Sequence, residues 1–163
     1  MMPAIAIIGG TGLTHMDTLQ ITARQTLATP YGEPSSPLTQ GELGGHAVVF
    51  LARHGQQHTL PPHRINYRAN LWALHRLGVR WVIAVAAVGG IRADLTPGVL
   101  AFPDQIVDYT WGRASTFFED PPSPVTHIDF TEPYCGELRE QLIQAARELH
   151  LDARETCTYA AVQ

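Results

Sequence analysis

Charge is scarce in this chain, which has neither a basic run nor a long hydrophobic one. Asp, Glu, Lys and Arg make up 16% of the 163 residues, and 15 acidic side chains outnumber 11 basic ones. The net charge of -4 and the lack of a basic patch argue against nucleic acid as a partner. The longest apolar run, residues 81–88, is far too short to cross a bilayer, and residues 1–3 lack the basic segment of a signal peptide. We therefore expect a cytoplasmic protein that contacts no membrane and no nucleic acid.

Cysteine is almost absent, and the two cysteines do not have the spacing of a metal-binding or redox motif. Cys135 and Cys157 fit neither metal nor redox spacing, so we expect both in the hydrophobic core. His54 and His58 have the i, i+4 spacing of a zinc pair, but Gly55 argues against a helix there and no carboxylate motif accompanies them. No metal site is therefore expected. The rest of the chain is 45% apolar and long enough to bury the core of one globular domain.

Three apolar runs have the character of buried strands, and glycine follows each of them within three residues. The runs are residues 4–8, 48–52 and 81–88, and the glycines that follow them are Gly9, Gly10, Gly55, Gly89 and Gly90. In open α/β sheets, ligands bind outside the carboxyl ends of the strands. The three ends therefore predict a single ligand site at one edge of a sheet.

The groups at these strand ends are suited to an anion. The Arg53 guanidinium can hold two oxygens of a phosphate or carboxylate, and His54 follows it in the chain. Backbone N–H groups of the glycine-rich turn at 9–12 can converge on an anion, and the Thr11 hydroxyl can donate to one. Two plainer interpretations stay open: a surface arginine at a strand end, and a tight turn without a ligand. The turn lacks both G-x-G-x-x-G and a Walker lysine, so it gives little support for a nucleotide cofactor.

The order of strand and helix patterns predicts an α/β fold with a mixed, twisted central sheet flanked by helices. Extended segments are expected at about 20–27, 38–43 and 46–52, and helices at about 65–77 and 133–150. Gly44-Gly45 indicates an antiparallel hairpin, whereas later strands alternate with helices, so the sheet is mixed. We expect residues 1–163 to form a single domain.

Three local features carry further expectations. Residues 81–88, apolar on both faces, indicate a central strand. In the helix at 65–77, Leu71 belongs to the apolar stripe and Asn70 to a solvated or subunit-facing side. The last segment, 156–163, has the pattern of a strand that ends without a further connection. The fold is therefore expected to be incomplete at its C-terminus.

Four blocks of the sequence resemble the purine nucleoside phosphorylases, above all the branch that acts on methylthioadenosine and methylthioinosine. The blocks are residues 7–13 (IIGGTGL), 51–55 (LARHG), 66–74 (NYRANLWAL) and 127–130 (HIDF). The resemblance runs from about Ala4 to the last residue, and residues 87–91 and 126–130 are most similar to the bacterial methylthioinosine enzymes. It implies a homotrimer with a nucleoside phosphorylase-like fold that uses inorganic phosphate as co-substrate and no other cofactor.

The resemblance also implies which residues form the site. In that family the phosphate would be held by Thr11, Arg53 and His54, the phosphate and ribose site would be lined by Ala86 and Ala87, and the neighbouring subunit's site would be reached, near the 5′ substituent, by His127. Relatives have Thr or Asn where this chain has Ala86. They also continue past Gln163 into a Gly-Pro-Arg motif, a sugar-contacting segment and acidic residues that bind the purine. No catalytic residue is therefore assigned within residues 1–163.

The expected reaction is phosphorolysis of a purine nucleoside, S-methyl-5′-thioinosine, to a free purine base and 5-methylthioribose 1-phosphate. A general purine nucleoside phosphorylase or a methylthioadenosine phosphorylase is the alternative within the family. The sequence decides neither between 6-oxo and 6-amino purines nor between methylthioribose and ribose. Outside the family, a hydrolytic nucleosidase would turn over without phosphate, and an inactive phosphate- or nucleoside-binding protein would not turn over at all.

Overall fold

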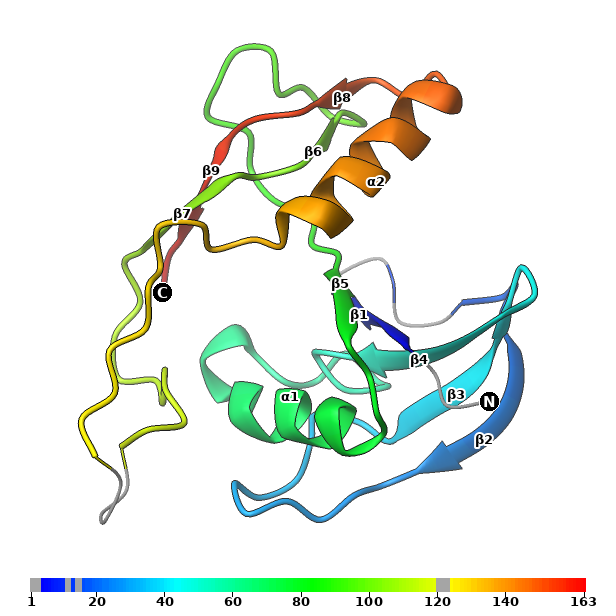
Figure 1. The fold of residues 1–163 in the computed structure, drawn as a ribbon, viewed down its shortest axis with the longest axis vertical. Helices are drawn as coiled ribbons and strands as arrows, with labels where there is room; N and C mark the ends of the chain where they lie inside the picture. The colour runs from blue at the N-terminus through cyan, green and yellow to red at the C-terminus, as the bar shows by residue number, and fades with distance from the viewer. Residues whose placement is uncertain (1–3, 11–12, 14–15, 120–123) are drawn as a thin grey trace. The chain divides into compact units, whose positions relative to one another are not determined.

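A computed structural model describes residues 4–10, 13, 16–119 and 124–163 (Figure 1). The chain divides into two compact units, and each is described by itself. The first comprises Met1–Ala87 with Ala114–Phe117, and the second comprises Val88–Arg113 with Phe118–Gln163. That residues 1–163 form one domain stays a prediction.

The first unit is built on a five-stranded mixed sheet, as predicted. Its strand order is β2-β3-β4-β1-β5. Strands β2, β3 and β4 are antiparallel neighbours, whereas β1 runs parallel to both β4 and β5. The strands are β1 (Ile5–Gly9), β2 (Gln20–Gln25), β3 (Leu38–Leu43), β4 (His46–Ala52) and β5 (Trp81–Ala84).

The hairpin between β3 and β4 turns at the two predicted glycines. Gly44 and Gly45 have φ angles of 57° and 82°, in the left-handed region that glycine enters without steric cost. Two consecutive residues with positive φ make the turn that matches the twist of an antiparallel pair. The prediction of a tight hairpin is confirmed.

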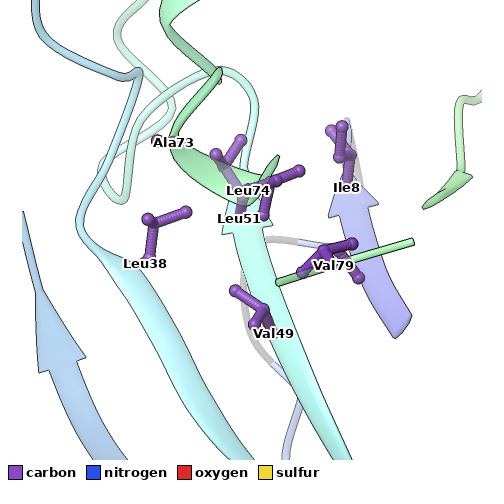
Figure 2. Close-up of a cluster of buried hydrophobic side chains, with 8 residues drawn as sticks. Ile8, Leu38, Val49, Leu51, Ala73, Leu74 and Val79 are labelled. Carbon is purple, nitrogen blue, oxygen red and sulfur yellow. The ribbon is translucent and has the colours of Figure 1, made fainter. Parts of the chain in front are cut away.

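Strand β4 is buried on both faces because a different hydrophobic cluster covers each face. Val49 and Leu51 join the cluster that includes Ala73 and Leu74 of helix α1 (Tyr67–Arg76) (Figure 2). The residues that alternate with them lie in a second cluster, made of Leu19, Val48, Phe50 and Ala52. This two-sided burial accounts for the unbroken apolar run in the sequence. Packing on both faces also fixes the position of the end of β4, which Arg53 and His54 follow.

The buried side of α1 differs from the predicted stripe. The helix begins after Asn66, whose side-chain oxygen accepts a hydrogen bond from the Ala69 N–H at 3.1 Å. Asn70 is only 3% exposed, whereas Leu71 is 42% exposed. The expectation that Asn70 faces solvent or another subunit is therefore wrong. The Asn70 amide faces inward because it forms hydrogen bonds with Ser35 there.

Strand β5 is shorter and less buried than expected. It ends at Ala84, and in the part of the chain that the structure describes it is an edge strand of the sheet. Residues 81–83 are half-buried, and residues 84–88 are exposed. The prediction of a central strand is wrong for these residues. An apolar run shows that a strand suits burial, but it does not show which segment covers it.

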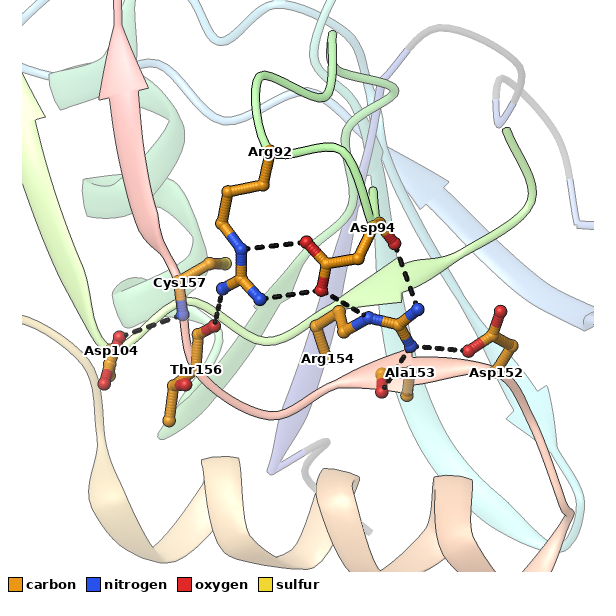
Figure 3. A network of polar contacts seen from close by, with 8 residues as sticks. All are labelled: Arg92, Asp94, Asp104, Asp152, Ala153, Arg154, Thr156 and Cys157. Carbon is orange, nitrogen blue, oxygen red and sulfur yellow. Dashed lines mark hydrogen bonds and ion pairs between the residues drawn. The ribbon is translucent and has the colours of Figure 1, made fainter. Parts of the chain in front are cut away.

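The second unit contains helix α2 (Gly136–Glu148) and two short parallel strand pairs. The pairs are β6 (Leu100–Ala101) with β8 (Ala153–Arg154), and β7 (Gln105–Asp108) with β9 (Thr158–Ala161). Figure 3 shows an ion-pair network beside β8. There, Asp94 accepts hydrogen bonds from Arg92 Nη2 at 2.7 Å and from Arg154 Nε at 2.8 Å.

Neither cysteine has the core position that was predicted. Cys135 is exposed at the start of α2, and Cys157 is partly exposed between β8 and β9. Burial raises the pKa of the Cys157 thiol. A raised pKa lowers the thiolate fraction, so this thiol is not activated as a nucleophile. Among the described residues, no helix is long and apolar enough to cross a membrane.

Candidate functional site

The carboxyl ends of three parallel strands meet in the first unit. Gly9 of β1 is paired with Ala52 of β4, and the next residue, Arg53, donates its backbone N–H to the Gly9 carbonyl at 2.9 Å. On the other side of β1, the Val85 N–H donates to the Ile8 carbonyl at 2.9 Å. These bonds extend the parallel ladders by one residue beyond the strands. They bring Gly10, Arg53 and Val85 together at one edge of the sheet.

The Arg53 guanidinium lies across Gly10 at this edge. Its Nη1 donates to the Val85 carbonyl at 3.3 Å. A Cβ atom added to Gly10 would lie 2.2 Å from Arg53 Nη2, so only glycine leaves room for the guanidinium there. The other N–H donors of this half-buried side chain have no partner among the residues that the structure describes. They are therefore available to an anion at the strand ends.

His54 is held at both its backbone and its ring. Its carbonyl accepts from the Leu60 N–H at 2.9 Å, and its Nδ1 lies 2.8 Å from the Leu60 carbonyl oxygen. A carbonyl only accepts, so Nδ1 carries the proton and Nε2 is the ring nitrogen left for another partner. The residue as a whole is 9% exposed. The imidazole therefore has a fixed orientation before any ligand binds.

The turn that carries both side chains closes at Gly55. The Gly55 N–H donates to the Ala52 carbonyl at 3.0 Å, and Gly55 has a φ of 79°. The His58 ring contacts the imidazole of His54 in a tilted arrangement, with ring centroids 4.8 Å apart and an interplanar angle of 48°. No group of three or more metal-ligating side chains occurs in the described part of the chain. The described contact between His54 and His58 is one between aromatic rings.

The other predicted site residues divide into three cases. Thr11 lies outside the described residues. Ala86 and Ala87 follow β5 in the first unit and are exposed. His127 belongs to the second unit, where it is exposed in a segment without regular secondary structure. The roles assigned to these residues stay predictions.

Sequence reasoning missed a group of polar residues behind the turn. The Asn70 side chain accepts from the Ser35 N–H at 2.7 Å and donates to the Ser35 hydroxyl at 2.9 Å. The Ser36 hydroxyl accepts from the Ala52 N–H at 3.1 Å. Asn70 and Ser36 are buried, at 3% and 6% exposed. The one sequence signal was an asparagine within an otherwise apolar helix face, and it gave no indication of its partner.

An open cavity of about 600 Å³ lies beside this group, but it does not contain the arginine. Its lining includes Ser35, Ser36 and Gly55, together with exposed residues of the loop after Gly55. Arg53 and Gly10 are not among the lining residues. Because the anion donors lie elsewhere, we place the candidate site at the strand ends and not in this cavity.

Known proteins resemble the chain over almost its whole length. The family described as "Phosphorylase superfamily" matches residues 4–163. An S-methyl-5′-thioadenosine phosphorylase of Hyperthermus butylicus is 48% identical over 98% of the chain and 57% of the relative. A probable S-methyl-5′-thioinosine phosphorylase of Xanthomonas campestris is 51% identical over 88% of the chain and 58% of the relative.

Solved structures agree with these relatives. The methylthioadenosine phosphorylase from Schistosoma mansoni in complex with adenine superposes with a TM-score of 0.91 and 34% identity, covering 98% of this chain and 65% of that one. The chain thus spans less than three fifths of the length of the two curated relatives. Its strand ends and its Arg53 turn lie within the shared part.

Proposed function

Because the chain belongs to the phosphorylase superfamily, we propose that this protein cleaves purine nucleosides with inorganic phosphate. The preferred substrate is S-methyl-5′-thioinosine, and the products are a free purine base and 5-methylthioribose 1-phosphate. The observation that carries the proposal is the Arg53 guanidinium held against Gly10 where three parallel strands end. The names of the Xanthomonas, Hyperthermus and Schistosoma proteins support a methylthio-nucleoside.

The reaction exchanges one bond at the sugar carbon for another. A phosphate oxygen forms a bond to C1′ while the bond from C1′ to the purine nitrogen breaks, and the electron pair leaves with the base. The transition state has the oxocarbenium character of glycoside cleavage. The protein must place a phosphate anion beneath the sugar and stabilise the departing base. Arg53, His54, Thr11 and the backbone at Gly10 perform the first of these tasks.

The segment after β5 completes the proposed site. Ala86 and Ala87 line the phosphate and ribose site. The side chain of Ala86 carries neither a hydroxyl nor an amide group. Phosphate is therefore held there by backbone groups and by the charge of Arg53. His127 acts in the site of a neighbouring subunit near the 5′ substituent, and the proposed assembly is a homotrimer. We place this enzyme of purine salvage in the cytoplasm.

A second candidate is a phosphate- or nucleoside-binding protein without turnover. Such a protein would bind phosphate through Arg53 but release no base at high protein concentration. A hydrolytic nucleosidase, by contrast, would release base equally well without phosphate.

The test begins with the intact mass of the purified protein. Base release is then measured from methylthioinosine, methylthioadenosine and inosine, each with and without phosphate. Arg53→Ala should cost about 2–4 kcal/mol of transition-state stabilisation, because it removes a charge-assisted donor. Arg24→Ala is the matched control, since Arg24 is exposed on β2. Unchanged phosphate dependence in Arg53→Ala would refute the assignment.

A further inference from the structure

The Arg53–His54 turn is braced by a short polar chain that begins on helix α1. Asn70 binds Ser35 at two points, its Oδ1 with the Ser35 N–H and its Nδ2 with the Ser35 hydroxyl. The two contacts span 35 positions of sequence. A planar amide with two bonds to one residue fixes both the position and the orientation of that residue. Because Asn70 is 3% exposed, water does not replace these bonds easily.

The next link joins Ser36 to the end of β4. Strand β3 pairs with β4 only as far as Thr39 opposite Phe50. Strand β3 begins at Leu38, and Ser36 and Pro37 precede it outside the strand. The Ser36 hydroxyl takes the place of a strand partner and accepts from the Ala52 N–H at 3.1 Å. Its own proton goes to the Pro37 carbonyl at 3.2 Å.

Ala52 is the residue on which the functional turn is built. Its carbonyl accepts the Gly55 N–H that closes the turn, and Arg53 and His54 are the two residues between them. Gly55 lies near the braced segment, because a Cβ added there would be 3.6 Å from the Ser35 carbonyl oxygen. A shift of Ser35 and Ser36 therefore reaches the turn through the hydrogen bond from the Ala52 N–H to the Ser36 hydroxyl.

We propose that Asn70 is a positioning residue for the phosphate site, acting through Ser35 and Ser36 on the turn that carries Arg53 and His54. This inference rests on the proposed function. Asn70 touches neither Arg53 nor His54 in the contacts above. Its effect on phosphate is geometric, and a displacement of about 1 Å in a binding group costs roughly 100-fold in a well-aligned site.

Asn66 provides a matched control on the same helix. It lies one turn before Asn70, and its amide also fixes the preceding loop, by donating to the Tyr31 carbonyl at 2.5 Å. It caps α1 as well, so its loss destabilises the helix. Its bonds reach neither Ser35 nor Ser36. Asn66→Ala therefore reports what loss of stability alone does to phosphate binding.

The experiment compares wild-type protein with Arg53→Ala, Asn70→Ala, Ser36→Ala, Asn66→Ala and the double variant of Asn70 and Ser36. The phosphate dissociation constant is measured by isothermal titration calorimetry at a temperature where every variant is folded, with Tm recorded for each. Asn70→Ala and Ser36→Ala should each weaken phosphate binding by roughly 10- to 100-fold. The double variant should be little weaker than either, because the two residues act along one route. Asn66→Ala should stay within about twofold of wild type despite a lower Tm.

The outcomes separate this inference from the proposed function. If wild-type protein does not bind phosphate, or if Arg53→Ala binds it equally well, the proposed site itself is wrong and the inference falls with it. If Arg53→Ala loses phosphate but Asn70→Ala binds within twofold of wild type, the site stands and the positioning role is refuted. Additive effects of Asn70→Ala and Ser36→Ala, or an equal loss in Asn66→Ala, would also refute it. If Asn70→Ala fails to fold, the Ser36→Ala result decides.

Discussion

Replacing Gly10 with alanine tests the strand-end site directly. The new Cβ would lie 2.2 Å from Arg53 Nη2 and 2.9 Å from the Val85 carbonyl oxygen. To bring the first distance to an ordinary contact of 3.4 Å, the guanidinium must move by about 1.2 Å, which is 3.4 minus 2.2. A misplacement of this size should weaken phosphate binding by about 10- to 100-fold, or about 1.4–2.7 kcal/mol.

Gly10→Ala should lower both binding and stability. The arginine side chain can swing away, but the Val85 carbonyl belongs to the backbone and must also shift, so we expect the free energy of unfolding to fall by about 1–2 kcal/mol. Gly44→Ala is the matched control, because its φ of 57° makes alanine strained although no atom lies within 4 Å of the new Cβ. It should lose similar stability without losing phosphate. Calorimetric titration and thermal unfolding measure the two quantities, and phosphate binding unchanged in Gly10→Ala would refute the placement of Arg53.

Two further predictions concern stability. Leu74 is 1% exposed in the cluster of Figure 2, so Leu74→Ala should lower the free energy of unfolding by about 3–5 kcal/mol in a urea titration, and a loss below about 1 kcal/mol would contradict this packing. In Figure 3, hydrogen bonds from Arg92, and then from Arg154, lower the pKa of Asp94 below its ordinary value of 3.8. Because the folded-state pKa is lowered, the stabilisation is present above about pH 4 and is lost as the pH falls through the folded-state pKa. Asp94→Asn should therefore lower Tm at neutral pH but bring it close to wild type near pH 2, and an equal difference at both pH values would contradict this role.

Part of the fold could be predicted from local pattern. The apolar run of β4 and the Gly44-Gly45 turn predicted a strand and a hairpin that the structure contains. These features depend on residues close in sequence, namely an unbroken apolar run and two consecutive glycines with positive φ. The neighbours of β5 could not be predicted in this way. Its apolar run is compatible with any covered position in a sheet, and among the described strands it lies at an edge.

The position of Asn70 is a clearer example of what helical periodicity could not predict. Helical spacing alone favoured Leu71 as the buried side chain, yet Leu71 is 42% exposed and Asn70 is buried. The helix accommodates an inward amide because Ser35 supplies a donor and an acceptor in the right places. Periodicity counts apolar residues and does not include a hydrogen-bonding partner from another segment.

By itself, the sequence determined an α/β chain with a mixed sheet, glycine-marked strand ends and an arginine suited to an anion. Each of these follows from residues that are adjacent or one turn apart. Only the tertiary structure decided that the Arg53 guanidinium meets Gly10 and Val85, and that Asn70 braces the turn through Ser35 and Ser36. These contacts join residues at least 16 positions apart in the sequence, as Ser36 and Ala52 are, and Arg53 and Val85 are separated by 32. Strand pairing and helix packing, not local preference, set such distances.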